Sequence, residues 1–269
     1  MRRRMQMMVL VCLLLGTIVA GSEAAGLSSG SAQTEENPRY SVEQILKFSK
    51  KLEKTLAAKG CYVALIARKG RPQEEMPEGM AFTHVGFAVY SDITTQDGRR
   101  VKGYAMYNAY QQDDKPHTSA LVNDYPPDFF ANVYALEAGV LIPSLTLQQR
   151  LLQTISSPLY KSFHDPRYSA IANPYTLGRQ NCTEFVLDIV NSSIYQTGDL
   201  RKIKAAERQY FVAQPVNVNP LKLVLGSMFM REITLADHPN TPVTATFETV
   251  ARYLLQYDKG SELLTVVPD

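Results

Sequence analysis

Three strand-length apolar runs follow one another between residues 61 and 110, and they constrain the fold more than any other feature. They are Cys61–Ala67 (CYVALIA), Phe82–Tyr90 (FTHVGFAVY) and Val101–Tyr110 (VKGYAMYNAY). The second and third flank a turn region containing Asp97 and Gly98, which is typical of an antiparallel hairpin. Helical patterns precede and follow the runs rather than alternating with them. The order predicts an α+β fold with a small antiparallel sheet.

Helical periodicity is clearest at the two ends of this pattern. Ser41 begins a helix and forms a capping-box pattern with Gln44, and Gly60 ends it. Its expected apolar face is Val42, Ile45, Leu46, Leu52 and Leu56. Further helices are expected at 128–136, 145–155, 182–191, 203–212 and 219–229, with a helix or strand at 247–257.

The first residues predict a secretory signal peptide at 1–24. Arg2, Arg3 and Arg4 precede an apolar run from residue 7 to residue 20, and the small-x-small pattern Ser22-Glu23-Ala24 follows it. The expected location is therefore periplasmic or secreted, with an N-terminal membrane anchor as the alternative. After a flexible leader at 25–38, one α+β domain is expected at 39–260. It carries a long insertion at about 112–181, and a C-terminal tail follows at 261–269.

The charge balance argues against a nucleic-acid partner. The chain has 28 Lys and Arg against 26 Asp and Glu. Removing residues 1–24 takes away three Arg and one Glu, which leaves no net charge. No later stretch is long and apolar enough for a stable membrane span once the signal has been cleaved.

A candidate nucleophile opens the segment QNCTEFVLDIV (180–190). Cys182 shares a helical face with Phe185, Val186, Ile189 and Val190, so it is expected to point inward. It also lies in the first helical turn, where free N–H groups and the helix dipole favour a thiolate. The alternative is a buried structural cysteine.

His84 is the best candidate for the base that such a thiol needs. His117 and His238 adjoin prolines in polar segments, whereas His164 lies beside Asp165 and remains a rival. In the strand pattern, His84 shares a face with the small residues Gly86 and Ala88, which leaves room for the cysteine helix to approach.

The third polar group of such a site is expected on the neighbouring strand. Folding the hairpin about residues 96–98 places His84 opposite residues 108–112. Asn108 is the preferred partner, with Gln111 second, and an amide there can fix the tautomer of the imidazole. Asn108 could equally be a polar residue at a strand end.

Oxyanion stabilisation would come from the backbone N–H of Cys182 and one side-chain donor. Gln180, Asn181 and Tyr175 are the candidates, and the sequence does not choose between them. No His, Cys or carboxylate group has metal-ligand spacing, so no metal and no other cofactor is expected. After signal cleavage the remaining cysteines are Cys61 and Cys182, which could instead form a disulfide.

These motifs resemble a known family. A strand with THVGF (83–87), followed about a hundred residues later by a helix opening with NCTEFV (181–186), resembles the circularly permuted NlpC class of papain-like cysteine hydrolases. The related lecithin–retinol acyltransferase-like group has the same order. The upstream run VALIARKG (63–70) is also similar. More closely, the chain resembles a family of secreted bacterial proteins known only as a domain of unknown function, and YSAIANPY (168–175) is part of that resemblance.

The resemblance implies that Cys182 is the nucleophile and His84 the base, while Asn108 follows by position rather than by a matched motif. It implies a hydrolase or acyltransferase acting on amides or esters, with a cell-envelope peptide or a lipid as substrate. The alternative function is a non-catalytic envelope protein that keeps the papain-like fold for binding or assembly, with Cys182 structural or disulfide-bonded to Cys61.

Overall fold

The computed structural model describes residues 38–95, 97–216 and 233–269. The expected signal peptide, nearly all of the leader and the helix expected at 219–229 lie outside these residues. Within them, no helix is both long enough and apolar enough to cross a membrane.

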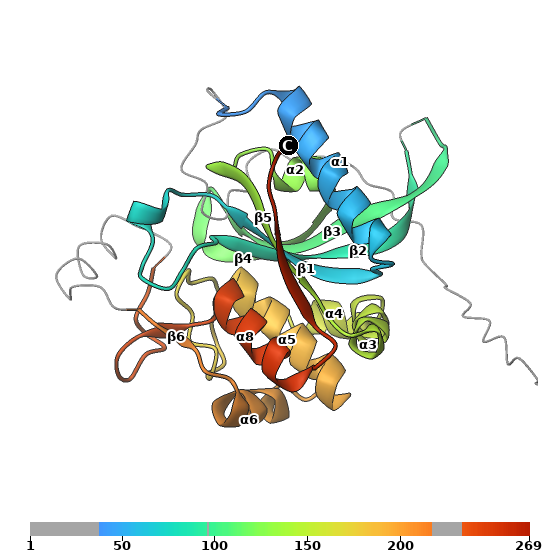
Figure 1. Ribbon diagram of the computed structural model, residues 1–269. Helices are drawn as coiled ribbons and strands as arrows, with labels where there is room; N and C mark the ends of the chain where they lie inside the picture. The colour runs from blue at the N-terminus through green and yellow to red at the C-terminus, as the bar shows by residue number, and fades with distance from the viewer. Residues whose placement is uncertain (1–37, 96, 217–232) are drawn as a thin grey trace, which may run out of the picture.

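A six-stranded antiparallel sheet forms the centre of the molecule (Figure 1). Its order is β4-β3-β2-β1-β5-β8. The strands are β1 (Val63–Lys69), β2 (His84–Thr94), β3 (Arg100–Gln112), β4 (Lys115–Asp124), β5 (Ala135–Ile142) and β8 (Glu262–Val266). The three runs recognised in the sequence are therefore neighbours, and the expected hairpin is confirmed as β2 and β3.

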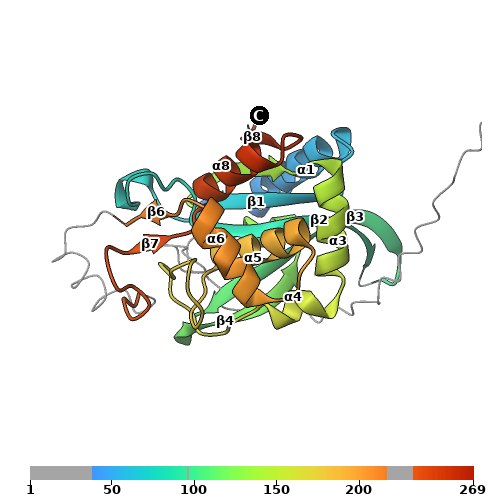
Figure 2. The ribbon, with the colours of Figure 1, turned by 90° about the horizontal axis from the view of Figure 1, so that it is seen from below.

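Helices cover both faces of the sheet (Figures 1 and 2). One face carries α1 (Val42–Ala58) and the short α2 (Pro126–Phe129), and the other is covered mainly by a larger group. That group comprises α3 (Leu145–Ile155), α4 (Pro158–Ser162), α5 (Cys182–Tyr195), α6 (Leu200–Tyr210) and α8 (Phe247–Tyr257). A small ribbon of β6 (Gln214–Pro215) and β7 (Val243–Thr244) lies beside it. The described part of the chain is thus a mixed α+β structure.

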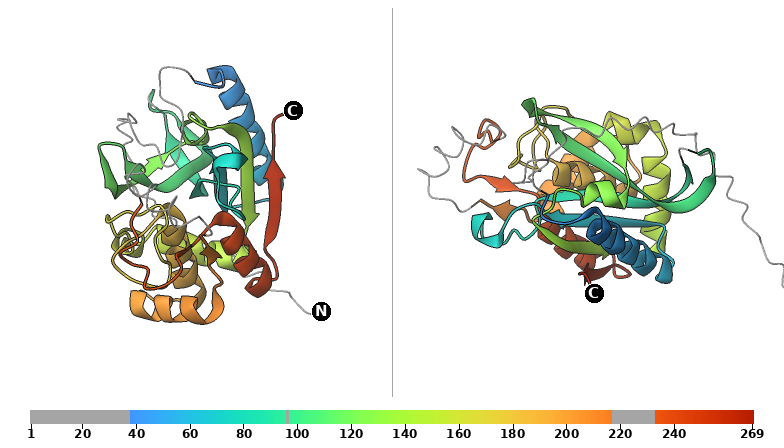
Figure 3. Two further views of the ribbon diagram at one scale, coloured as in Figure 1. Left: turned by 90° about the vertical axis from the view of Figure 1, so that its left-hand side faces the viewer. Right: turned by 90° about the horizontal axis from the view of Figure 1, so that it is seen from above.

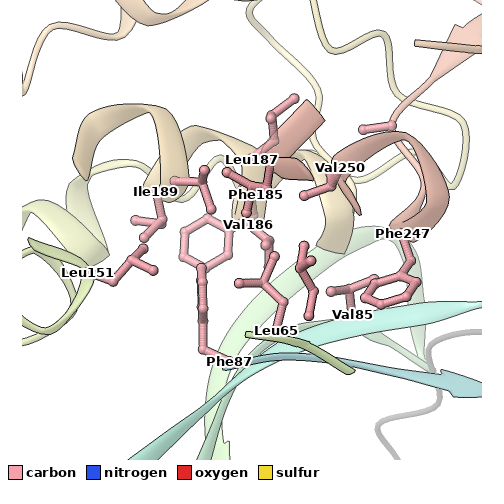
Figure 4. Packing of buried hydrophobic residues seen from close by; sticks show 14 of the residues in the cluster. Leu65, Val85, Phe87, Leu151, Phe185, Val186, Leu187, Ile189, Phe247 and Val250 are labelled. Carbon is pink, nitrogen blue, oxygen red and sulfur yellow. The ribbon is translucent and has the colours of Figure 1, made fainter. Parts of the chain in front are cut away.

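Alternation along β2 divides its side chains between two apolar cores. Val85, Phe87 and Val89 pack with the apolar side chains of α5 in one core, which Figure 4 shows in part. Ala88 packs with α1 in the core on the other face. Each buried aliphatic or aromatic side chain contributes about 1.5–3 kcal/mol, so the branched and aromatic side chains of α5 stabilise its packing against the sheet and the neighbouring helices.

The first helix matches its sequence pattern at the start but not along its whole face. Ser41 and Gln44 form the expected capping box. Val42 and Leu46, however, are 73% and 50% exposed. Only one narrow face of the helix, which includes Phe48, packs on the sheet. Val42 and Leu46 lie outside this face and are exposed to solvent.

Three expectations about the second half were wrong. Residues 128–136 do not form a helix, because α2 ends at Phe129 and β5 begins at Ala135. The region 112–181 is part of the central sheet rather than an insertion, since it supplies β4 and β5. The segment at 261–269 is not a tail, because β8 pairs along the edge of β5 (Figure 3). The helix expected at 128–136 overlaps the start of β5 (ALEAGVLI), which is largely buried. A mostly apolar run of this kind cannot be told from a helix by periodicity.

Candidate functional site

Cys182 is the first residue of α5, as the sequence predicts. The helix begins there because the side chain of Asn181 accepts the N–H of Glu184 at 2.8 Å. Cys182 is only 4% exposed, so its thiol is enclosed by the protein.

The thiol meets β2 where that strand has separated from β3. Tyr90 donates its N–H to the carbonyl of Tyr62, the residue just before β1, so by alternation the N–H of Val85 points toward the β3 side. The β2–β3 ladder begins only at Phe87 and leaves this N–H outside it. The Val85 N–H interacts instead with the sulfur of Cys182.

The resting thiol is neutral. Burial raises the pKa of Cys182, and the N–H groups of Val85 and Thr183 together with the Thr183 hydroxyl offset this only in part. The expectation that the first helical turn would favour a thiolate is therefore outweighed by desolvation.

His84 and Asn108 are joined by a hydrogen bond, as the hairpin register predicts. His84 is fully buried, and its Nε2 lies 3.2 Å from Oδ1 of Asn108. The amide nitrogen of Asn108 donates to Oδ1 of Asp124 at 2.8 Å, so the oxygen of the amide faces the imidazole. Nε2 therefore carries the hydrogen and Nδ1 keeps its lone pair. Nδ1 is buried and has no hydrogen-bond partner in the described part of the chain.

The expected approach of the cysteine helix was wrong in one respect. Helix α5 does not pack on the face that carries His84 and Gly86, but on the opposite face with Val85 and Phe87. Larger apolar side chains bury more surface against the helix, and the space beside Gly86 is filled by Asn108. Cys182 and His84 therefore reach the end of the β2–β3 ladder from opposite faces of the sheet.

Aromatic rings enclose the imidazole. The ring of Tyr110 stacks on His84 with centroids 4.6 Å apart and an interplanar angle of 19°, and Phe129 lies 5.5 Å away. Burial lowers the pKa of His84, and the positive charge of Arg68 lowers it further. His84 is therefore neutral at rest and able to accept a proton.

Arg68 and Asp124 belong to this site although the sequence reasoning did not single them out. Arg68 is 3% exposed, lies opposite His84 in the β1–β2 ladder and donates to the carbonyl of Phe129. Burial raises the pKa of Asp124 to about 7, against the effects of the Tyr110 hydroxyl and Arg68. Arg68 could have been noticed as the charge that ends an apolar strand beside the histidine strand.

The three side chains proposed as oxyanion donors are used by the fold. Both N–H groups of Gln180, both of Asn181 and the hydroxyl of Tyr175 donate to other protein groups at 2.8–3.1 Å. In this conformation, their donors are committed to bonds that hold the loop before α5 in place.

The other candidate groups lie in separate environments. His164, the rival base, is 2.9 Å from the hydroxyl of Ser119. His238 donates to the carbonyl of Ile171 at 2.8 Å, and Gln111 donates to that of Pro116 at 3.1 Å. The described residues contain no group of three or more His, Cys, Asp or Glu placed to hold a metal ion.

Cys61 and Cys182 are both free thiols, so the disulfide alternative is not supported. Cys61 precedes Tyr62, which pairs with Tyr90, whereas Cys182 contacts Val85. Five residues of β2 span about 16 Å, and a disulfide requires Cα atoms within about 7 Å.

A buried charge cluster beside the site also escaped the sequence reasoning. Nζ of Lys204 lies 2.8, 2.7 and 3.0 Å from carboxylate oxygens of Glu184, Asp188 and Glu207. All four side chains are at most 2% exposed. Burial raises the pKa of Glu184 and of Glu207. The neighbouring carboxylates raise both further, because the three acidic groups share one ammonium group. The available signal was Glu184 and Asp188, two charges four residues apart on the otherwise apolar helix α5.

The fold and site define a class of mixed α+β proteins in which a buried cysteine at a helix start lies against a strand carrying a buried histidine. The chain belongs to the family described as "Uncharacterized protein conserved in bacteria (DUF2145)", whose model matches residues 55–254. No curated protein shows significant similarity to it.

One solved structure that is similar is described as the metalloprotein yiiX from Escherichia coli O157:H7, DUF1105. The identity is 14% and the TM-score is 0.45, over 78% of this chain and 97% of that chain.

Proposed function

We propose that this protein is a cysteine hydrolase or acyltransferase in which Cys182 is the nucleophile, His84 the base and Asn108 the residue that orients the base. The observation that carries the proposal is the state of the imidazole. Nε2 is held by Asn108, Nδ1 is an unpaired acceptor, and the next residue, Val85, contacts the thiol. A Cys-His-Asn set with this division of roles is a known variant of the catalytic triad.

The proposed fold is a circularly permuted papain-like one. Its support is the order of the elements, since the histidine strand β2 precedes the cysteine helix α5. The hairpin partner β3 supplies the orienting amide of Asn108.

The thiol of Cys182 and Nδ1 of His84 are not hydrogen-bonded in the described structure, so the proposed reaction requires a rearrangement that brings them together. Nδ1 of His84 then takes the proton of Cys182 as the sulfur attacks the carbonyl carbon of an amide or ester. The new C–S bond forms as the bond to the leaving amine or alcohol breaks, and the imidazolium returns its proton to that leaving group. Water, or an acceptor hydroxyl or amine, then attacks the thioester and restores the thiol. The backbone N–H of Cys182, in the first turn of α5, would stabilise the oxyanion.

The proposed substrates are acyl groups of the cell envelope, in peptides or lipids. The support is the signal-peptide pattern at residues 1–24, which would place the protein in the periplasm or outside the cell. Because Cys182 and His84 are buried, the site must open before either substrate can enter.

The test is covalent labelling by an activated acyl ester, followed by intact-mass analysis and mapping of the modified residue. We expect one acyl group on Cys182 in the unmodified protein and none in Cys182→Ala. The variant His84→Gln, which keeps a polar side chain, should be labelled at least about tenfold more slowly.

Two matched variants control for general effects. Cys61→Ser removes the other buried thiol of the described chain, and His164→Gln removes the rival histidine. Both should be labelled like the unmodified protein. Equal labelling of the Cys182→Ala variant, or of His84→Gln, would overturn the proposal.

One observation favours the second candidate, a non-catalytic binding protein. Both Cys182 and His84 are closed off and neutral, as a purely structural pair would be. That reading predicts no acyl adduct with any ester while the protein is folded. It also predicts a loss of thermal stability in Cys182→Ala that matches the removal of a small buried side chain.

A further inference from the structure

A continuous chain of hydrogen bonds leads from His84 to a residue outside the proposed catalytic set. His84 Nε2 contacts Asn108 Oδ1 at 3.2 Å, and Asn108 Nδ2 donates to Asp124 Oδ1 at 2.8 Å. The other oxygen, Oδ2 of Asp124, accepts the hydroxyl of Tyr110 at 2.8 Å. The ring of that same Tyr110 stacks on the imidazole. The four side chains close a circuit built from β2, β3 and β4.

The chemistry of this circuit is directional. An amide can present either its oxygen or its NH2 group to a histidine, and the two choices select opposite tautomers. An ionised carboxylate only accepts, so Asp124 requires the NH2 group of Asn108 to face it. The amide oxygen must then face Nε2 of His84. Without Asp124, the orientation of Asn108 would not be determined by its partners.

We propose that Asp124 is a positioning residue which, through Asn108, holds His84 in the tautomer whose Nδ1 can take the proton of Cys182. The inference rests on the proposed function and extends it to a fourth residue. In the described part of the chain no hydrogen bond joins Asp124 to the thiol or to the imidazole, and it acts only by orienting the amide that lies between its carboxylate and His84.

The ionisation of Asp124 links this tautomer to pH. Burial brings the pKa of Asp124 to about 7. Once protonated, Asp124 can donate to the oxygen of Asn108, and the amide can then turn its NH2 group toward His84. The charged and titratable groups that act on Asp124 are Arg68 on β1, Tyr110 on β3 and Asp128 on α2. The proton at Asp124 thus decides the direction of the circuit.

The experiment compares Asp124→Asn with the unmodified protein by two readouts. The first is the ¹⁵N spectrum of the histidine ring nitrogens, with the His84 signals assigned by their loss in His84→Gln. We expect a single tautomer with hydrogen on Nε2 in the unmodified protein at pH 8, and a mixture in Asp124→Asn. The second is the pH profile of acyl labelling at Cys182. In the unmodified protein the labelling rate should rise in a step near pH 7, where Asp124 ionises. In Asp124→Asn the step should be absent, and the plateau rate should be about 10- to 100-fold lower.

Asp128→Asn is the matched control, because it removes a nearby carboxylate that caps α2 without bonding to Asn108. It should keep the single tautomer at pH 8 and the height of the plateau, while the step moves to lower pH because the charge of Asp128 raises the pKa of Asp124. Tyr110→Phe keeps the stacked ring but removes the hydroxyl, and should give an intermediate result.

The outcomes separate the two proposals. If Asp124→Asn keeps the tautomer and the labelling profile, the positioning role is overturned. If the tautomer depends on Asp124 but the unmodified protein forms no acyl adduct, the positioning role stands and the proposed enzymatic function fails.

Discussion

The carboxamide of Asn108 occupies the space that any side chain at position 86 would need. A Cβ atom built on Gly86 would lie 2.1 Å from Oδ1 of Asn108, far inside van der Waals contact. The glycine two residues after the histidine on β2 therefore makes room for the amide that binds His84.

We predict that Gly86→Ala displaces Asn108 and breaks its bond to His84. Overpacking should cost about 1–3 kcal/mol of unfolding free energy, and the proposed reactivity of Cys182 should fall with it. Urea unfolding and acyl labelling would measure the two effects.

The control for this variant is Gly103→Ala on β3. There an added Cβ would meet the flexible end of Ile93 at 3.1 Å, which can give way. Equal effects of the two substitutions would show that the space beside Gly86 has no special role.

Lys204 is expected to be essential for stability. Lys204→Met would leave Glu184, Asp188 and Glu207 buried without their cation. Removing one partner of a buried ion pair costs about 3–5 kcal/mol. Urea unfolding followed by circular dichroism measures this, with the exposed Lys202→Met on the same helix as control. A loss below about 1 kcal/mol would contradict the prediction.

The charge cluster should also make stability depend on pH. Burial raises the pKa of Glu207 above its value in the unfolded chain, so the folded state binds more protons than the unfolded state. The unfolding free energy should therefore fall as pH rises from about 5 to about 8, by up to about 1.4 kcal/mol per pH unit for one proton. The raised pKa of Lys204 contributes stability that is lost only at strongly alkaline pH.

Unfolding curves across this range test the sign. Glu207→Gln keeps an acceptor for Asn191 and should flatten the dependence. The lowered pKa of His84 acts in the opposite direction in both proteins, so the comparison with the variant is decisive. The same pH dependence in Glu207→Gln and in the unmodified protein would be inconsistent with a proton bound at Glu207.

The thiol of Cys182 should show no thiolate at neutral pH in the resting protein. Burial raises its pKa, and it raises that of Cys61 to about 12. The absorbance of thiolate at 240 nm should therefore match that of the Cys182→Ser variant at pH 7. A clear excess that disappears in the variant would point to a preformed ion pair with His84.

The sequence was sufficient for the part of the site that lies on one hairpin. Alternation in β2 and the turn at residues 97–98 led to Asn108 as the partner of His84, and the structure joins them. The start of α5 at Cys182 was predicted from the helical spacing of the apolar residues that follow it, and the structure adds Asn181 as the cap. Local rules of this kind act over a few residues.

Asp124 could not be found in the same way. It ends β4, a strand whose first residues include Pro116 and several polar side chains, so the pattern did not indicate a strand. The face on which α5 packs was also out of reach. One face of β2 offers the apolar side chains of Val85 and Phe87 for packing, whereas the space on the other face is filled by Asn108. That difference arises only once the strands have come together.

The enclosure of Cys182 and His84, at 4% and 0% exposure, has a consequence for how this protein would bind any ligand. A ligand that needs the thiol can associate only with molecules whose site is open, so its measured dissociation constant is the intrinsic one divided by the open fraction. With about one molecule in a hundred open, affinity would be weakened about a hundredfold. Substitutions that increase the open fraction would then tighten binding, even at positions that do not contact the ligand.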